Sequence, residues 1–282
     1  MPSLHLRLRL LPALVAASLM LAGAARAAES TVSHGGREII VYLPSHLPPP
    51  GSRALVVVLH GGLGNAARIA GRQAEGALNM DEVADKRGFI VAYLNGTPVA
   101  RMLSDRMLGW NAGGGCCGLP AKNDVDDVGY IKGAVDDLVG KYGVDRGRVF
   151  GIGHSNGAMM AQRVACETTL FAAIVAVSGP LNLDASRCPA AAGHRVLAMH
   201  GADDQNVPID GGRGTKGISG VAFKSEAFAK QIVTQSGGSY TLLVVPGADH
   251  MIDHIDAAML RTEAMGIAEK AAQFFGIPNQ AP

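Results

Sequence analysis

One serine in this chain of 282 residues stands in a setting that can turn its hydroxyl into a nucleophile. Ser155 is the middle residue of the run G-H-S-N-G (153–157), between an apolar stretch at 148–152 and a helix-forming stretch at 155–167. A Gly-x-Ser-x-Gly run between a strand and a helix is typical of a nucleophile elbow, a sharp turn that lifts the serine above a sheet. The same pattern can arise by chance in a glycine-rich chain, but the strand and helix around it favour the elbow. We therefore predict that Ser155 is a catalytic nucleophile.

A serine hydroxyl needs a neighbouring base before it can attack a carbonyl carbon. After a nucleophile elbow, the acid and then the base follow the serine along the chain. His250 lies in the loop after the last apolar stretch (240–245) and is the predicted base, with His254 as the alternative. A zinc site on these two histidines is disfavoured because no H-E-x-x-H pattern is present.

The acid is expected in the loop after the preceding apolar stretch (195–200). That loop contains Asp203 and Asp204, of which we predict Asp204 as the acid and keep Asp203 as the alternative. The carboxylate would accept the Nδ1–H of His250 and stabilise its protonated form. The other aspartate is expected to bond nearby backbone, as aspartates do in turns. His200, at the end of the stretch, is interpreted as structural.

Two backbone N–H groups are expected to stabilise the oxyanion that forms when an ester carbonyl is attacked. Asn156, directly after the nucleophile, would supply one of them. Gly62, in the run H-G-G-L-G (60–64), would supply the other, with Leu63 as the alternative. His60 is interpreted as bracing this loop rather than as catalytic.

The only tryptophan, Trp110, lies in a stretch with few periodic residues (95–123). Loops of this length inside a compact domain are usually functional. We predict that Trp110 is a substrate-binding residue at the pocket, although packing in the core is the common role of a lone tryptophan.

Apolar runs of strand length alternate with helix-like stretches along the chain. Strands are predicted over 38–43, 54–59, 89–94, 148–152, 171–177, 195–200 and 240–245. Helices are predicted over 65–86, from Asp126 or Asp127 to 142, and over 155–167, 222–236 and 262–275. This alternation predicts an α/β fold with a mostly parallel central sheet and helices on both faces. No repeat or linker divides it, so residues 28–282 are predicted to form a single domain.

Residues 1–27 have the pattern of a secretory signal peptide. Arg7 and Arg9 precede an apolar run (10–25), and Ala-Arg-Ala (25–27) provides a cleavage site. The run is shorter than the roughly 20 apolar residues that span a bilayer, so we expect no membrane attachment after cleavage. We predict a secreted or periplasmic protein.

The overall charge and the cysteines limit the remaining possibilities. A formal net charge of +1 carries no electrostatic signature of a nucleic-acid partner. An exported chain can form disulfides, and the pair Cys166–Cys188 is favoured over Cys116–Cys117. Adjacent Cα atoms lie about 3.8 Å apart, which is closer than most disulfides allow. No pattern implies a metal or an organic cofactor.

Several ordered motifs resemble a known family of enzymes. They are V-V-V-L-H-G-G (56–62), G-W-N-A-G (109–113), C-C-G (116–118), V-D-D-V-G-Y-I (125–131), G-H-S-N-G-A-M-M-A (153–161), H-G-A-D-D-Q-N-V-P (200–208) and G-A-D-H (247–250). The chain is similar to secreted single-domain α/β-hydrolase esterases of the polyhydroxybutyrate depolymerase and feruloyl esterase family. The resemblance implies an α/β-hydrolase fold, a triad of Ser155, Asp204 and His250, and oxyanion donors at Gly62 and Asn156.

The same resemblance implies a serine esterase that hydrolyses feruloyl, acetyl or hydroxybutyrate-oligomer esters, with a small-molecule or oligomeric ester as its partner. Members of the family usually carry Trp-Pro after the base, whereas Met251 and Ile252 follow His250 here, so a different pocket wall is expected. A serine peptidase, an acyl transferase and a binding module without activity are the rival hypotheses. The natural ester, attack on polymer and the oligomeric state are left open.

Overall fold

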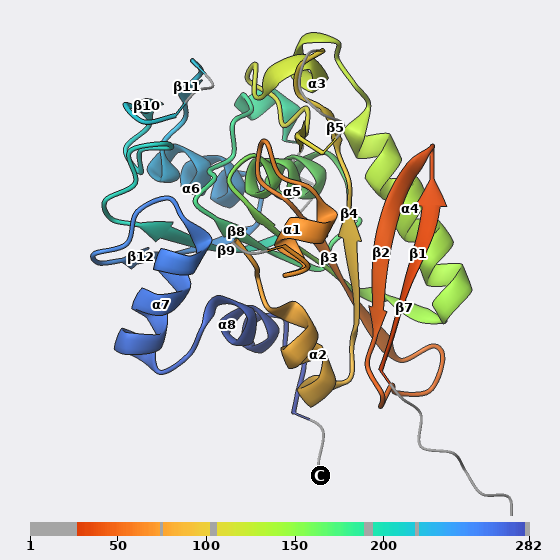
Figure 1. Ribbon diagram of the computed structural model, residues 1–282. Helices are drawn as coiled ribbons and strands as arrows, with labels where there is room; N and C mark the ends of the chain where they lie inside the picture. Colours follow the sequence, from red (N-terminus) through yellow and green to blue (C-terminus); the bar gives the residue numbers. More distant parts are fainter. Residues whose placement is uncertain (1–26, 74–75, 102–105, 189–193, 218–219, 280–282) are drawn as a thin grey trace, which may run out of the picture.

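The computed structural model describes residues 27–73, 76–101, 106–188, 194–217 and 220–279. Apart from Ala27, the predicted signal peptide lies outside these ranges. A central sheet runs through the molecule with helices packed on both of its faces (Figure 1).

The sheet has eight strands in the order β1-β2-β4-β3-β7-β8-β9-β12. Their bounds are β1 (Ala28–His34), β2 (Arg37–Leu43), β3 (Arg53–Leu59), β4 (Ile90–Leu94), β7 (Val144–His154), β8 (Ala173–Val177), β9 (Arg195–Gly201) and β12 (Ser239–Val245). Neighbouring strands from β4 to β12 are parallel, and β1 and β2 extend that edge in antiparallel fashion. The predicted mostly parallel sheet is therefore confirmed.

Two apolar layers hold the helices against this sheet. The helices α4 (Asp127–Tyr142), α5 (Asn156–Glu167) and α6 (Glu226–Gln235) share one layer. The helices α1 (Ala66–Ile69), α2 (Met80–Arg87), α7 (Ile252–Glu263) and α8 (Ile267–Phe274) share the other. Strand β3 supplies both, because Leu55 and Val57 point to the first layer while Val56 and Val58 point to the second. A strand buried on both faces explains the unbroken apolar run at 54–59.

The predicted helix over 65–86 is wrong, because the chain forms two helices there. Helix α1 ends at Ile69 and α2 begins at Met80. Between them Gly71 and Gly76 have φ angles of 74° and 82°, which lie in the left-handed region that interrupts a helix.

Other boundaries also differ from the prediction. Residues predicted as the start of a helix at 222 form β11 (Ala222–Phe223), which pairs with β10 (Gly212–Arg213), and α6 begins after a cap at Ser225. The predicted helix over 262–275 is the end of α7 followed by α8, with Ala264 in a left-handed conformation between them. Strand β1 and most of α7 were not predicted.

The predicted loop over 95–123 contains short elements. These are β5 (Thr97–Pro98), β6 (Leu108–Gly109) and α3 (Gly118–Lys122). Strands β5 and β6 pair with each other, so the segment folds back on itself over the carboxyl end of the sheet.

All four cysteines are paired. Cys166 on α5 is joined to Cys188, the pairing that the sequence favoured. Cys116 is also joined to Cys117, across a cis peptide bond that brings their Cα atoms to 2.9 Å. The expectation against a bridge between these neighbouring cysteines is therefore wrong.

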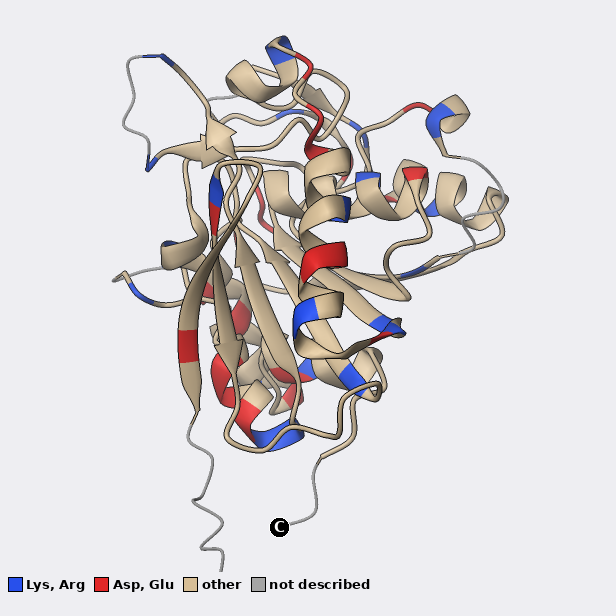
Figure 2. Cartoon of the chain, turned by 90° about the vertical axis from the view of Figure 1, so that its right-hand side faces the viewer, with Lys and Arg blue, Asp and Glu red and all other residues tan. Residues whose placement is uncertain are grey.

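Charged residues of both signs are spread along the chain. Figure 2 shows basic and acidic residues interspersed along the described chain rather than gathered by sign. Within the described residues, no helix has both the length and the apolar character needed to span a bilayer.

Candidate active site

Ser155 occupies a sharp turn between the central strand β7 and helix α5. Its backbone has φ 54° and ψ −121°, a strained conformation that a residue with a side chain rarely adopts. The turn requires glycine on either side. A Cβ atom on Gly153 would lie 2.3 Å from the carbonyl oxygen of Gly157, and one on Gly157 would lie 2.2 Å from that of Leu59. The predicted elbow geometry is thus present.

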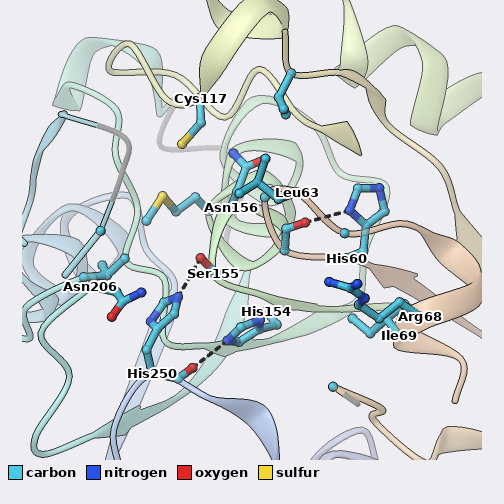
Figure 3. A pocket seen from close by; sticks show the side chains of 18 of the residues that line it. His60, Leu63, Arg68, Ile69, Cys117, His154, Ser155, Asn156, Asn206 and His250 are labelled. Atoms are coloured by element: carbon cyan, nitrogen blue, oxygen red, sulfur yellow. Dashed lines mark hydrogen bonds between the residues drawn. The ribbon is translucent and has the colours of Figure 1, made fainter. Parts of the chain in front are cut away.

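The three residues predicted as a triad lie in hydrogen-bonding contact. The Oγ of Ser155 is 2.9 Å from Nε2 of His250, and Nδ1 of His250 is 2.7 Å from Oδ2 of Asp204 (Figure 3 shows the first pair). The loops after β9 and β12 bring the acid and the base together, because the N–H of Asp203 donates to the carbonyl oxygen of Ala248. These residues come from three separate strand ends, as the sequence predicted.

Asp204 is buried and held in its ionised form. Burial alone would raise its pKa, but hydrogen bonds from His200 and His250 outweigh burial and hold the pKa well below its usual range. Its other oxygen, Oδ1, accepts the N–H groups of Asn206 and Val207 at 2.9 Å. The carboxylate is therefore fixed in position and charge.

The two alternative residues lie elsewhere. Asp203 is exposed, and only its backbone takes part in the contact between the loops. His254 is exposed on α7 and bonds Asp249 through Nδ1 at 2.8 Å. In the described part of the chain, no set of three or more His, Cys, Asp and Glu side chains is arranged to hold a metal ion.

His154, the residue before the nucleophile, braces the base and was not predicted to do so. Its Nε2 donates to the carbonyl oxygen of His250 at 2.8 Å. Burial, and then the nearby charge of His250 when protonated, lower the pKa of His154 to about 3, so this ring is neutral. The only signal in the sequence was its position inside the elbow motif.

The predicted oxyanion loop lies beside the nucleophile. A Cβ atom on Gly61 would lie 3.4 Å from Cβ of Ser155, and one on Gly62 would lie 3.7 Å from Cβ of Asn156. The N–H of Gly64 donates to the carbonyl oxygen of Gly61, which closes the turn. Leu63, the alternative donor, lines the same cavity with a φ of 65°.

The side chain of His60 bonds the oxyanion loop to the chain at Gly96. Its Nε2 accepts the N–H of Gly96 at 3.1 Å, so Nδ1 carries the proton and donates to the carbonyl oxygen of Gly61. Burial lowers the pKa of His60 to about 4, and the ring is neutral. The bracing role that the sequence indicated fits these contacts.

The prediction that Trp110 binds substrate at the pocket is wrong. Its side chain is fully buried and lies in the core against His60 and Tyr130. The indole Nε1–H donates to the carbonyl oxygen of His60 at 2.9 Å. A buried indole satisfies its N–H in this way, which gives Trp110 a structural role.

Asn156 connects the elbow to the Trp110 segment. Its Oδ1 accepts the N–H of Trp110 at 2.7 Å, and its Nδ2 donates to the carbonyl oxygen of Trp110 at 3.1 Å. The side chain thus fixes the loop while its backbone N–H stays at the start of α5, where the macrodipole favours negative charge.

These residues surround a cavity of about 640 Å³, large enough for a small organic ligand. Ser155 and His250 line it, together with apolar side chains that include Met159, Phe223 and Met251. Cys116 and Cys117 form part of the wall, and Met251 stands exposed at the rim (Figure 3 labels Cys117). The wall after the base is thus built on methionine in place of the Trp-Pro pair.

The family and the two relatives that this chain resembles in sequence are named as esterases. Residues 49–229 match the pattern of the Phospholipase/Carboxylesterase family. NocK of Nocardia uniformis subsp. tsuyamanensis, a protein named as an esterase, is 34% identical over 163 residues, which are 57% of this chain and 43% of that protein. Feruloyl esterase B of Piromyces equi is 26% identical over 187 residues, 62% of this chain and 31% of that protein. The chain spans less than half the length of each of these two relatives.

Solved structures of similar fold include proteins that are not named as esterases. A puromycin-hydrolysing peptidase of Mycobacterium tuberculosis superposes with a TM-score of 0.60 at 17% identity, covering 93% of this chain and 42% of the peptidase. At such low identity the similarity concerns the fold alone.

Proposed function

The chain belongs to the phospholipase/carboxylesterase family and has the α/β-hydrolase fold, and from that premise we propose that it is a serine esterase that hydrolyses carboxylic esters through Ser155, His250 and Asp204. The observation that carries the proposal is the continuous chain of hydrogen bonds from Ser155 Oγ to Asp204 Oδ2 at the wall of the cavity.

In the first step Ser155 Oγ attacks the carbonyl carbon of the ester while Nε2 of His250 takes the hydroxyl proton. Asp204 accepts the Nδ1–H of His250 and stabilises the imidazolium that results. The backbone N–H groups of Gly62 and Asn156 stabilise the oxyanion, and each such donor contributes about 2.7–4 kcal/mol of transition-state stabilisation.

The imidazolium of His250 then donates its proton to the leaving alkoxide, which leaves an acyl group on Ser155. A water molecule, activated by the now neutral His250, hydrolyses this acyl-enzyme and restores the serine. No residue of the chain other than these has to exchange a proton with the substrate.

As substrates we propose feruloyl, acetyl or hydroxybutyrate-oligomer esters. The apolar lining of the cavity suits an aromatic or short aliphatic acyl group, and one relative bears the name feruloyl esterase B. We also propose that the protein is exported. The two disulfides support this, because such bonds persist in oxidising compartments.

The test of the proposal is the variant Ser155→Ala. Loss of the nucleophile should lower hydrolysis of 4-nitrophenyl acetate by about 10⁶-fold, to the limit of detection. His254→Ala is the matched control, since that exposed histidine should be dispensable. Wild-type turnover in Ser155→Ala protein would refute the assignment.

Two further measurements separate the rivals. Covalent labelling of Ser155 by a fluorophosphonate, located by peptide mass, would exclude a binding module without activity. A panel of esters and matching aminoacyl amides distinguishes an esterase from a peptidase, and the proposal requires faster turnover of the esters.

A further inference from the structure

A second buried polar cluster lies directly behind Asp204, and the proposed reaction does not use it. His200 lies near the end of strand β9, Glu226 begins helix α6, and Tyr240 lies on strand β12. The exposed fractions of these residues are 0%, 1% and 6%. Burying charged groups costs free energy unless they are paired. The hydrogen-bond partners of His200 therefore indicate its protonation state.

Both ring nitrogens of His200 face acceptors. Nε2 lies 2.8 Å from the carbonyl oxygen of Val207, which can only accept, so Nε2 carries a proton. Nδ1 lies 2.7 Å from Oε1 of Glu226. The second oxygen of Glu226 accepts the hydroxyl of Tyr240. With a proton on Nδ1 as well, His200 is an imidazolium that pairs with both carboxylates, Glu226 and Asp204.

The electrostatic balance of the cluster agrees with this assignment. Burial would lower the pKa of His200, but the hydrogen bonds to Asp204 and Glu226 outweigh it and raise the pKa to about 9. The pKa of the Tyr240 hydroxyl is raised well above its usual value, mainly by burial, so Tyr240 remains a neutral donor. The charged groups that pair with His200 are Glu226 and Asp204.

His200 and His250 share one oxygen atom. Oδ2 of Asp204 lies 2.7 Å from Nδ1 of His250 and 3.3 Å from Nε2 of His200. The other oxygen is already occupied by two backbone N–H groups. A proton on His250 therefore places a second positive charge on an oxygen that already has one beside it.

We propose that His200 is a positioning residue that carries a fixed positive charge and thereby keeps His250 neutral, and so able to act as a base, in mildly acidic solution. Asp204 alone would favour a protonated His250, and His200 offsets part of that attraction. Two neutral groups also contact His250, the Ser155 hydroxyl and the ring of His154. This inference rests on the proposed serine-esterase mechanism.

The first experiment measures the pH dependence of kcat/KM for 4-nitrophenyl acetate. The double variant His200→Gln, Glu226→Gln removes the cation together with its anionic partner and so leaves the cluster's net charge unchanged. Because the lost cation is the group nearer to Asp204, the acidic midpoint of the profile should rise by about one pH unit. Tyr240→Phe is the control, since it disturbs the cluster without altering the charge beside Asp204, and its midpoint should stay at the wild-type value.

A purely structural role for His200 would lower kcat or the free energy of unfolding and leave the midpoint in place. That outcome in a folded double variant overturns the proposal, as does an equal shift in Tyr240→Phe.

The second experiment does not depend on activity. Nitrogen NMR of the full chain labelled with ¹⁵N-histidine should show two protonated ring nitrogens on one buried histidine at pH 7. The Glu226→Gln variant assigns the signal to His200, because the Nδ1 resonance of His200 must move when its partner changes. Only neutral buried histidines at pH 7 would overturn the proposal even if Ser155 proves to be the nucleophile. Conversely, failure of Ser155→Ala to lose activity would refute the esterase mechanism while leaving the NMR result unaffected.

Discussion

Asp127 and Asp204 are two buried carboxylates with almost the same local setting. Each is the second member of an Asp-Asp pair, and in each pair the first aspartate stays exposed. Asp126 accepts the N–H of Gly129 and caps α4, so the predicted cap is the first of its pair. Asp127 instead bonds Nη1 of Arg37 at 2.6 Å and the N–H of Asn111 at 2.7 Å. Both of its oxygens are used, as are those of Asp204.

The two aspartates differ in what their hydrogen-bond partners contact. Asp204 bonds a histidine whose second nitrogen faces Ser155 and the cavity, whereas Asp127 bonds an arginine and a loop backbone. Burial and complete hydrogen bonding thus mark both carboxylates as important to the fold. What distinguishes Asp204, the aspartate proposed to take part in catalysis, is that its partner His250 in turn contacts Ser155.

The largest expected effect comes from Asp204→Asn. The amide would present an N–H to Nδ1 of His250 and favour the tautomer that cannot accept the serine proton. We expect kcat for 4-nitrophenyl acetate to fall by roughly 10³–10⁴-fold while the protein remains folded. Steady-state kinetics and urea unfolding measure the two quantities, and a loss of less than tenfold would remove the distinction between the two aspartates.

Asp127→Asn should act mainly on stability. The substitution leaves the half-buried guanidinium of Arg37 without its counter-charge, and we expect the free energy of unfolding to fall by about 2–3 kcal/mol. The matched control is Asp126→Asn, which can still cap α4 and should change the free energy of unfolding by less than about 0.5 kcal/mol. A collapse of kcat in Asp127→Asn, comparable with that of Asp204→Asn, would contradict this view.

The smallest expected effect concerns His60. This neutral histidine packs against Trp110, next to the residue Asn111 whose N–H bonds Asp127. Its folded pKa of about 4 lies below the unfolded value of 6.5, so its contribution to stability is present at neutral pH and is lost as the pH falls from about 6.5 to about 4. Between pH 7.5 and 5.5 this loss amounts to about 1 kcal/mol. Urea unfolding of His60→Gln at both pH values should show a smaller decrease than wild type, and an equal decrease would contradict the assignment.

The residues of the proposed triad could be predicted because each follows a recognisable strand end. The runs at 148–152, 195–200 and 240–245 are apolar and form parallel strands, and parallel strands present their carboxyl ends at one edge of the sheet. The order of the three loops then limits which Ser, Asp and His side chains can meet.

Features that depend on distant partners could not be predicted. The burial of Trp110 follows from its bonds to Asn156 and to the carbonyl oxygen of His60, which lie 46 and 50 residues away. The partnership of His200 with Glu226 likewise joins a strand end to a helix start 26 residues later. Neither contact leaves a pattern in the local sequence.

Two errors had signals that were readable. Gly71 and Gly76 stand inside the stretch predicted as one helix and mark the break between α1 and α2. The apolar residues Ile252, Ile255 and Met259 have helical spacing and are buried on α7, directly after the predicted base.

The two hydrogen bonds between the side chain of Asn156 and the backbone of Trp110 have a consequence for remodelling the cavity. Through Trp110, one turn of chain is tied both to the residue that follows Ser155 and to the loop that contains Gly62. A change of length or shape in that turn would therefore displace both proposed oxyanion donors together. Met251 is exposed, lines the cavity and makes none of these bonds, so it offers a place where a new acyl group can be accommodated without moving either donor.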